Sequence, residues 1–124
     1  MSEFSDYLEN ALINAVLRNT SYTSPATVYV ALFTSDPTDA GTGTELSGNG
    51  YARTAVTFGS PSNGVTTNSA DVTFPTATAS WGTVSHIGIY DASTSGNLFV
   101  KGDFSTINLT TGDSIQFTFK TQFS

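Results

Sequence analysis

The sequence predicts a mainly β fold, a small antiparallel β-sandwich or barrel-like domain of about six to seven strands preceded by one N-terminal amphipathic helix. An apolar repeat with a helical period is confined to the first 19 residues. After it come short runs rich in β-branched and aromatic residues, separated by turn-forming dipeptides. At 124 residues the chain fits one domain, with the helix expected in 1–19 and the β-sandwich in 20–124.

The predicted helix covers residues 3–18, where apolar side chains recur with the 3.6-residue period of an amphipathic helix. Ser2 or Ser5 can cap it, and Asn19 can end it in a left-handed conformation. Such a helix can pack either on its own sandwich or in the groove of a neighbouring subunit. Its apolar stripe comprises Phe4, Leu8, Leu12 and Ala15, widened by Ile13, Val16 and Leu17.

The strands are predicted from runs of β-forming residues bounded by turns. Asn49-Gly50 and Asn63-Gly64 are strong turn dipeptides. The connection from Thr34 to Gly50 is unusually long for a compact domain, which suggests either an assembly arm or a floppy loop. The predicted strands are 26–33, 51–58, 70–74, 84–91, 97–104 and 113–120, the last with Ile115, Phe117 and Phe119 on one face.

The run from Trp81 to Asp91 joins a strand pattern to the only histidine of the chain. Strict alternation places Val84, His86, Gly88 and Tyr90 on one face and Ser85, Ile87 and Ile89 on the other. Because adjacent strand residues face opposite sides, Ser85 and His86 should not form a catalytic pair. We expect His86 to be a half-buried or interface residue bonded to backbone.

Trp81 stands before Gly82 at the entrance of this strand. It is predicted to plug the core with its indole N–H bonded locally, and the alternative is an anchor into a neighbouring subunit.

The charge pattern argues against a nucleic-acid partner. The net charge is −6, and the four cations Arg18, Arg53, Lys101 and Lys120 are scattered, whereas phosphate binding needs a basic stripe. The absence of cysteine excludes disulfides and thiolate chemistry, and no apolar run approaches the ~20 residues that span a bilayer. With 11% charged residues, copies could pack side by side at small electrostatic cost, although an ordinary Thr-rich soluble β domain fits this composition equally well.

Ligand-binding motifs are weak, and we expect no cofactor. In the acidic loop, Asp36, Asp39 and Glu45 are weak calcium candidates, but the alternation of an EF-hand is missing and a solvated turn is the default. Asp91 and Asp103 could approach as a carboxylate pair for sugar hydrolysis, although acidic residues at strand ends more often form turns. The glycine pairs of 41–43 and 48–50 complete no phosphate loop.

Six segments of the chain resemble a family of small tailed-bacteriophage proteins usually labelled tail fibre proteins. The most specific part of the similarity is the run from Trp81 to Asp91. The C-terminus departs, since the family tends to end in a Gly-Asp-Leu strand and an acidic tail. The segments that carry the resemblance are Ser5 to Asn10, Tyr22 to Phe33, Pro37 to Gly41, Gly48 to Arg53, Phe74 to Val84 and Gly88 to Ala92.

The resemblance implies a non-enzymatic virion structural protein, assembled in the host cytoplasm. It would be a tail- or neck-associated fibre or adaptor subunit that forms a homo-oligomer and docks on other phage virion proteins, without a nucleic-acid or membrane partner. The alternatives are a capsid decoration or head-fibre protein and a carbohydrate-binding module contacting a host surface glycan. Arg53 and Asp91 are expected to bond to backbone or to each other. The structural and interface candidates are Phe4, Leu8, Leu12, Tyr51, Arg53, Trp81, His86 and Asp91.

Overall fold

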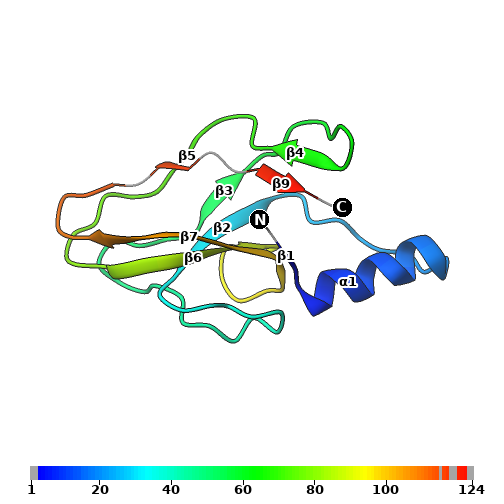
Figure 1. The fold of residues 1–124 in the computed structure, drawn as a ribbon, viewed down its shortest axis with the longest axis horizontal. Coiled ribbons are helices and arrows are strands. Elements are labelled where there is room, and N and C mark those ends of the chain that lie inside the picture. Colours follow the sequence, from blue (N-terminus) through cyan, green and yellow to red (C-terminus); the bar gives the residue numbers. More distant parts are fainter. Residues whose placement is uncertain (1–2, 115, 118–119, 123–124) are drawn as a thin grey trace.

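A computed structural model describes residues 3–114, 116–117 and 120–122. The fold is mainly β and antiparallel with a helix near the N-terminus, which confirms the predicted class (Figure 1). Its centre is a five-stranded antiparallel sheet in the order β1-β7-β6-β2-β3. These strands are β1 Glu3–Phe4, β2 Val28–Phe33, β3 Thr54–Val56, β6 Gly82–Tyr90 and β7 Leu98–Leu109.

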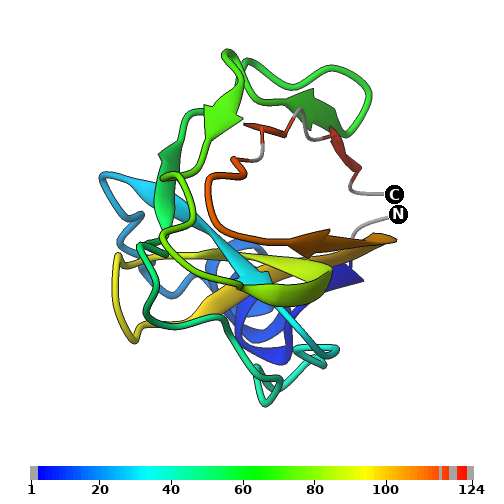
Figure 2. The same cartoon turned by 90° about the vertical axis from the view of Figure 1, so that its left-hand side faces the viewer.

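Two short strand pairs lie over one side of this sheet, and the 34–50 segment lies on the other side (Figure 2). β4 (Val65–Thr67) pairs with β9 (Lys120–Gln122), and β5 (Val72–Thr73) pairs with β8 (Gln116–Phe117). The predicted strand 113–120 is therefore replaced by two strands with different partners. The prediction for Ile115 and Phe119 lies outside the described residues.

The helix α1 (Asp6–Leu12) starts three residues later than predicted and continues as a π-helical turn, Ile13–Leu17. The preceding Glu3–Phe4 is drawn into the sheet as β1, where it pairs with Val100 and Lys101 of β7. Ser5 is the N-cap, and its Oγ accepts a hydrogen bond from the Leu8 amide at 3.1 Å. The same hydroxyl donates to the Leu98 carbonyl, which ties the start of the helix to β7.

The predicted left-handed stop at Asn19 is confirmed, since its φ is 56°. The Thr20 amide there donates to the Asn14 carbonyl at 2.9 Å, which supplies a partner for a carbonyl at the helix end.

The strands differ from the predictions mainly at their ends. β7 reaches Leu109 rather than residue 104 because it pairs with β6 as far as Gly82 opposite Leu109. The strand β4, which follows the Asn63-Gly64 turn, was not predicted, because three residues are too few to show alternation.

The larger of two apolar clusters is the main core, between the sheet and the short strand pairs. Phe4 and Leu8 pack against it at the helix end of the molecule. A smaller cluster, Ala31, Phe33, Tyr90 and Leu98, lies on the other face of the sheet. The main core contains Val30, Leu32, Leu46, Val56, Val72, Phe74, Ala77, Trp81, Val84, Ile89, Phe99, Val100 and Leu109.

The predicted strict alternation along β6 is wrong at its first half. The pairing of β6 with β7 shifts register between Val84 and His86. Val84 is fully buried in the same cluster as Ile89, with Ile87 packed against it, rather than on the face of Tyr90. The change falls at a bulge, where three residues of β7, 104–106, lie opposite the single residue Ser85 of β6 and the local twist of the strands increases.

The long 34–50 connection is neither an extended arm nor a floppy loop. Pro37 and Leu46 are buried, and Glu45 forms a β-bridge with Phe33. The Leu46 amide donates to the Leu32 carbonyl at 3.0 Å. The segment therefore packs on its own sheet, with its backbone hydrogen-bonding groups partly satisfied by β2.

Candidate functional site

A polar network centred on Arg53 lies beside the smaller cluster. Arg53 stands directly before β3 and contacts Glu45 through two hydrogen bonds, Nη2 to Oε1 at 2.8 Å and Nε to Oε2 at 2.9 Å. Its Nη1 donates to the carbonyls of Ala92 at 3.0 Å and Ser95 at 2.7 Å. The guanidinium carbon also lies 3.9 Å from the centre of the Tyr90 ring. One side chain thus joins the 34–50 segment, β3 and the turn between β6 and β7.

Tyr51 completes this network from the core side. Its hydroxyl donates to Glu45 Oε2 at 2.6 Å and accepts from the Leu32 amide at 3.1 Å. Its ring stacks on Phe74 and meets Trp81 edge-on. The tyrosine therefore connects the ion pair to the main core.

The electrostatics keep this network in one charge state. Burial opposes the charge of Arg53, but the hydrogen bonds to Glu45 outweigh it and raise the pKa of Arg53 above its usual value. Burial, helped by the hydrogen bond to Glu45, raises the pKa of Tyr51 far above its usual range. At neutral pH Tyr51 is thus a neutral donor and Arg53 a fixed cation, as suits structural bonds rather than proton transfer.

One of the two expectations for Asp91 was a bond to Arg53, and the structure does not show this bond. It accepts from the Asn97 amide at 2.7 Å and from Asn97 Nδ2 at 3.0 Å, and so closes the turn between β6 and β7. Arg53 holds two carbonyls of the same turn, so the two residues fix one loop from its two sides. Asp103 lies opposite His86 on β7, away from this turn, and does not pair with Asp91.

Trp81 is 6% exposed and belongs to the main core, where the sequence analysis placed it. Its indole N–H is not bonded locally. It donates to the carbonyl of Asn49 at 2.8 Å, in the turn at the end of the 34–50 segment. Asn49 Nδ2 in turn donates to the Ser80 carbonyl at 3.0 Å, so the contact is reciprocal.

His86 is half-buried, and its partner differs from the expected backbone group. Its Nδ1 lies 2.7 Å from Ser85 Oγ, a pair that strict alternation excluded and that the bulge allows. Asp103 is its cross-strand neighbour, but no hydrogen bond joins the two in the described part of the chain. Within the described residues no carboxylate is hydrogen-bonded to the imidazole, so the pair lacks there the orienting group of a catalytic triad.

The three weak calcium candidates are not brought together. Asp36 forms an exposed ion pair with Lys101 at 3.0 Å, and Glu45 is held by Arg53. The hydrogen bond from the Thr38 amide lowers the pKa of the Asp36 carboxyl group, and the hydrogen bond from Lys101 lowers it further. Asp39 contributes only a carbonyl bond, to the Asp6 amide. Within residues 3–114, 116–117 and 120–122, no cluster of three His, Cys, Asp or Glu side chains is placed to hold a metal ion.

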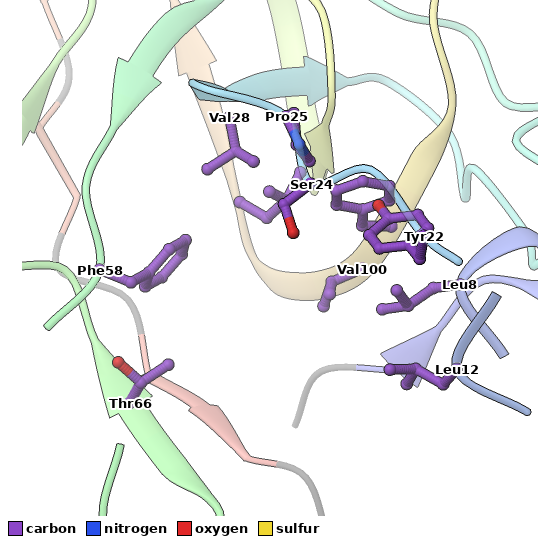
Figure 3. Close-up of a pocket in the computed structure, with 11 residues that line it drawn as sticks. Leu8, Leu12, Tyr22, Ser24, Pro25, Val28, Phe58, Thr66 and Val100 are labelled. Carbon is purple, nitrogen blue, oxygen red and sulfur yellow. The ribbon is translucent and has the colours of Figure 1, made fainter. Parts of the chain in front are cut away.

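An apolar groove with a volume of about 360 Å³ opens beside the helix. Leu8 and Leu12 of α1 line one side, and Phe58 and Thr66 line the opposite side (Figure 3). Val100 contributes from the sheet. The remaining lining residues are Tyr22, Ser24, Pro25, Val28, Ile89 and Phe99.

Beyond the groove, the apolar stripe continues onto an exposed end of the helix. Ile13 is 48%, Val16 is 73% and Leu17 is 77% exposed. Of the predicted interface residues, Phe4 and Leu8 pack on the core, whereas Leu12 is 38% exposed at the edge of the groove. We call Ile13, Val16 and Leu17 the helix-end patch. Among the helices of the described residues, none is long and apolar enough to cross a membrane.

Glu45 is the site residue whose role the sequence analysis missed, since it was considered only as a calcium ligand. A signal for its pairing exists, because Glu45 and Arg53 flank the Asn49-Gly50 turn at nearly equal distance. Opposite charges placed in this way across a tight turn can meet.

These features define a mainly β structural module, in which polar side chains lock loops and an apolar helix end faces outward. A family model described as "Podophage GP4 fiber I protein gp80" matches residues 3–122, and the chain belongs to this family. The protein is therefore a phage fibre structural protein and a virion component, which confirms the resemblance seen in the sequence. No curated protein matches the chain.

Proposed function

We propose that this protein is a non-enzymatic, tail- or neck-associated fibre or adaptor subunit, folded as one domain, that self-associates and docks on other virion proteins. Family membership over residues 3–122 supports the virion role. The helix-end patch is the observation that carries docking, because large apolar side chains at 48 to 77% exposure are costly to leave in water.

Burial of the helix-end patch would provide substantial binding energy. Complete burial of one Val, Leu or Ile side chain is worth about 1.5–3 kcal/mol. The patch continues into the apolar groove at Leu12, so a partner could cover both with one surface. Its nearest charge is Arg18, while the acidic residues of the helix lie in its first turns. A partner helix or strand with an apolar face fits this surface.

The non-enzymatic role is supported by how the chemically active groups are used. Arg53, Glu45 and Tyr51 bind one another and the backbone of neighbouring loops. His86 contacts Ser85 without an orienting carboxylate among the described residues. Each of these groups has a structural partner that explains its position.

The described surface gives little support to the carbohydrate-binding alternative. The large exposed aromatic residues there are Tyr7 and Tyr22. They line one pocket together and Tyr7 stacks on Phe99, so they form a pair rather than an exposed row of rings. The capsid decoration alternative differs from the proposal in location alone, so imaging must separate them.

The docking surface is tested with the double variant Val16→Ser/Leu17→Ser. Because both side chains are exposed, the variant should fold normally by circular dichroism. Its incorporation into phage particles should fall roughly tenfold or more, because the apolar contact is lost. Asn10→Ser, an exposed polar change on the same helix, is the matched control and should incorporate like the wild type. Normal incorporation of the double variant would remove the helix end from the interface.

The position on the particle is tested by cryo-electron imaging. We expect density for this protein at the tail or neck. Density spread over the capsid would overturn that placement in favour of a decoration protein.

A further inference from the structure

The outer edge of β7 is open over its second half. β1 pairs with β7 only at Val100 and Lys101. On its inner side β7 pairs with β6 as far as Leu109. Among the described residues, no strand partner covers the outer edge of 106–109. Figure 1 shows the C-terminal end of β7 at the left, at the end of the sheet away from the helix.

Apart from a bulge at its start, this edge lacks the usual protection against further pairing. Natural sheets shield edge strands with charges, prolines, bulges or very short strands. The opposite edge strand, β3, has only three residues. In β7 the bulge opposite Ser85 comprises 104–106, and regular pairing with β6 resumes at Ile107. Residues 104–109 contain neither a charge nor a proline.

The same segment lies in the part of the sheet beyond β2, since β2 pairs with β6 at residues 86–90 and β7 pairs with β6 as far as Gly82. Thr106, Ile107 and Asn108 are consecutive and all exposed, so both faces of the strand meet solvent. Ile107 is 37% exposed and β-branched, which suits a position inside a larger sheet. An added strand would satisfy the outer backbone groups and cover Ile107.

We infer that residues 106–109 of β7 form the self-association surface and pair antiparallel with the same segment of a second copy. This inference rests on the proposed self-association. Two chains of net charge −6 repel each other, and this uncharged edge lets them meet without facing acidic side chains. Antiparallel pairing about a two-fold axis also places the two Asp103 carboxylates at opposite ends of the contact. The two five-stranded sheets then become continuous across the dimer.

Cross-linking tests the contact directly, because the chain contains no cysteine. Asn108→Cys places a single thiol on the open edge. Thr83→Cys places one on the exposed, directly paired position of the interior strand β6. With a short bismaleimide, Asn108→Cys should give a covalent dimer and Thr83→Cys should stay monomeric. Equal cross-linking of the two variants, or none in either, would overturn the inference.

Charge insertion provides the second measurement. Asn108→Lys introduces two like charges at the proposed contact, whereas Thr83→Lys adds the same charge on the neighbouring strand. Sedimentation velocity over a concentration series should show that Asn108→Lys weakens dimerisation roughly tenfold or more, which corresponds to about 1.4 kcal/mol. Thr83→Lys should dimerise like the wild type. Circular dichroism checks that both variants are folded.

The outcomes separate this inference from the proposed function. A wild-type dimer that neither lysine variant weakens would place self-association on another surface and overturn the role of β7 alone. A wild type that stays monomeric at every concentration would also overturn the inference. Incorporation of the wild-type protein into particles, measured independently, then decides whether the proposed virion role still holds.

Discussion

At the scale of single residues, the Arg53–Glu45 pair shows why a largely uncharged chain retains a partly buried charge. The Arg53 side chain is 8% exposed and that of Glu45 is 25% exposed. Removal of one partner would leave the other charge desolvated, which costs more than the pair contributes in isolation. The fork of the guanidinium also reaches two loop carbonyls, a geometry that lysine does not reproduce.

We predict that Glu45→Gln destabilises the fold by about 3 kcal/mol, because Arg53 loses its charged acceptor in a poorly solvated site. Urea unfolding followed by circular dichroism measures this change. Asp36→Asn is the matched control, since its ion pair with Lys101 has a carboxylate side chain that is 49% exposed and should be worth about 0–1 kcal/mol. Similar losses for the two variants would contradict the structural role of the Arg53 network.

The raised pKa of Tyr51 predicts that the folded protein loses stability at alkaline pH. Its pKa is raised in the folded state, so its contribution to stability is fully present below the unfolded tyrosine pKa of about 10 and is lost as the pH rises above that value. Unfolding free energies measured between about pH 9 and about pH 11 should therefore fall less steeply in Tyr51→Phe than in the wild type. Tyr90 also has a raised pKa and contributes equally to both curves. If the two curves were parallel, ionisation of Tyr51 would not be linked to unfolding.

At the scale of elements, the start of the helix depends on one hydroxyl. Ser5 is 1% exposed, accepts from the Leu8 amide and donates to the Leu98 carbonyl. It therefore both caps α1 and fixes the helix to β7 just after β1 leaves the sheet. The position of the helix-end patch follows from this junction.

We predict that Ser5→Ala lowers the free energy of unfolding by about 1–2 kcal/mol, because the Leu8 amide loses its capping acceptor and the Leu98 carbonyl loses its donor. Thermal unfolding with the near-ultraviolet signal measures it. Ser24→Ala, on the rim of the groove, is the control and should change stability little. An unchanged melting temperature for Ser5→Ala would show that the helix is held by its apolar contacts alone.

The bulge in β7, opposite Ser85 of β6, is the element that most changes the chemistry of the site. At this bulge Val84 packs in the main core, and the hydroxyl of Ser85 lies beside the imidazole of His86. A binary pattern of apolar and polar residues does not reveal an inserted residue, because each half of the strand still alternates correctly.

At the scale of the whole molecule, the net charge of −6 opposes self-association, while the proposed contact along β7 is uncharged. We predict that added salt strengthens the dimer, because the screening length falls from about 30 Å at 0.01 M to about 8 Å at 0.15 M and the repulsion between copies weakens. Sedimentation equilibrium at these two ionic strengths measures the change. Dissociation on salt addition would instead indicate an interface built from ion pairs.

The whole-molecule arrangement also relates the two proposed surfaces. The helix lies at one end of the sheet, and the C-terminal end of β7 with its open edge lies at the opposite end (Figure 1). A subunit could therefore contact a copy of itself through β7 and another virion protein through the helix-end patch. The family match covers both regions.

The sequence by itself determined the mainly β class, the N-terminal helix, the cap choice that includes Ser5, the stop at Asn19 and the burial of Trp81. These depend on local propensity and on periodicity, which neighbouring residues encode. Tertiary structure decided the pairing of Arg53 with Glu45, the bond from Trp81 to Asn49, the packing of the 34–50 segment and the bulge beside His86. Each of these joins groups that are distant in sequence or alters register, and only the closed sheet brings such groups within hydrogen-bonding distance.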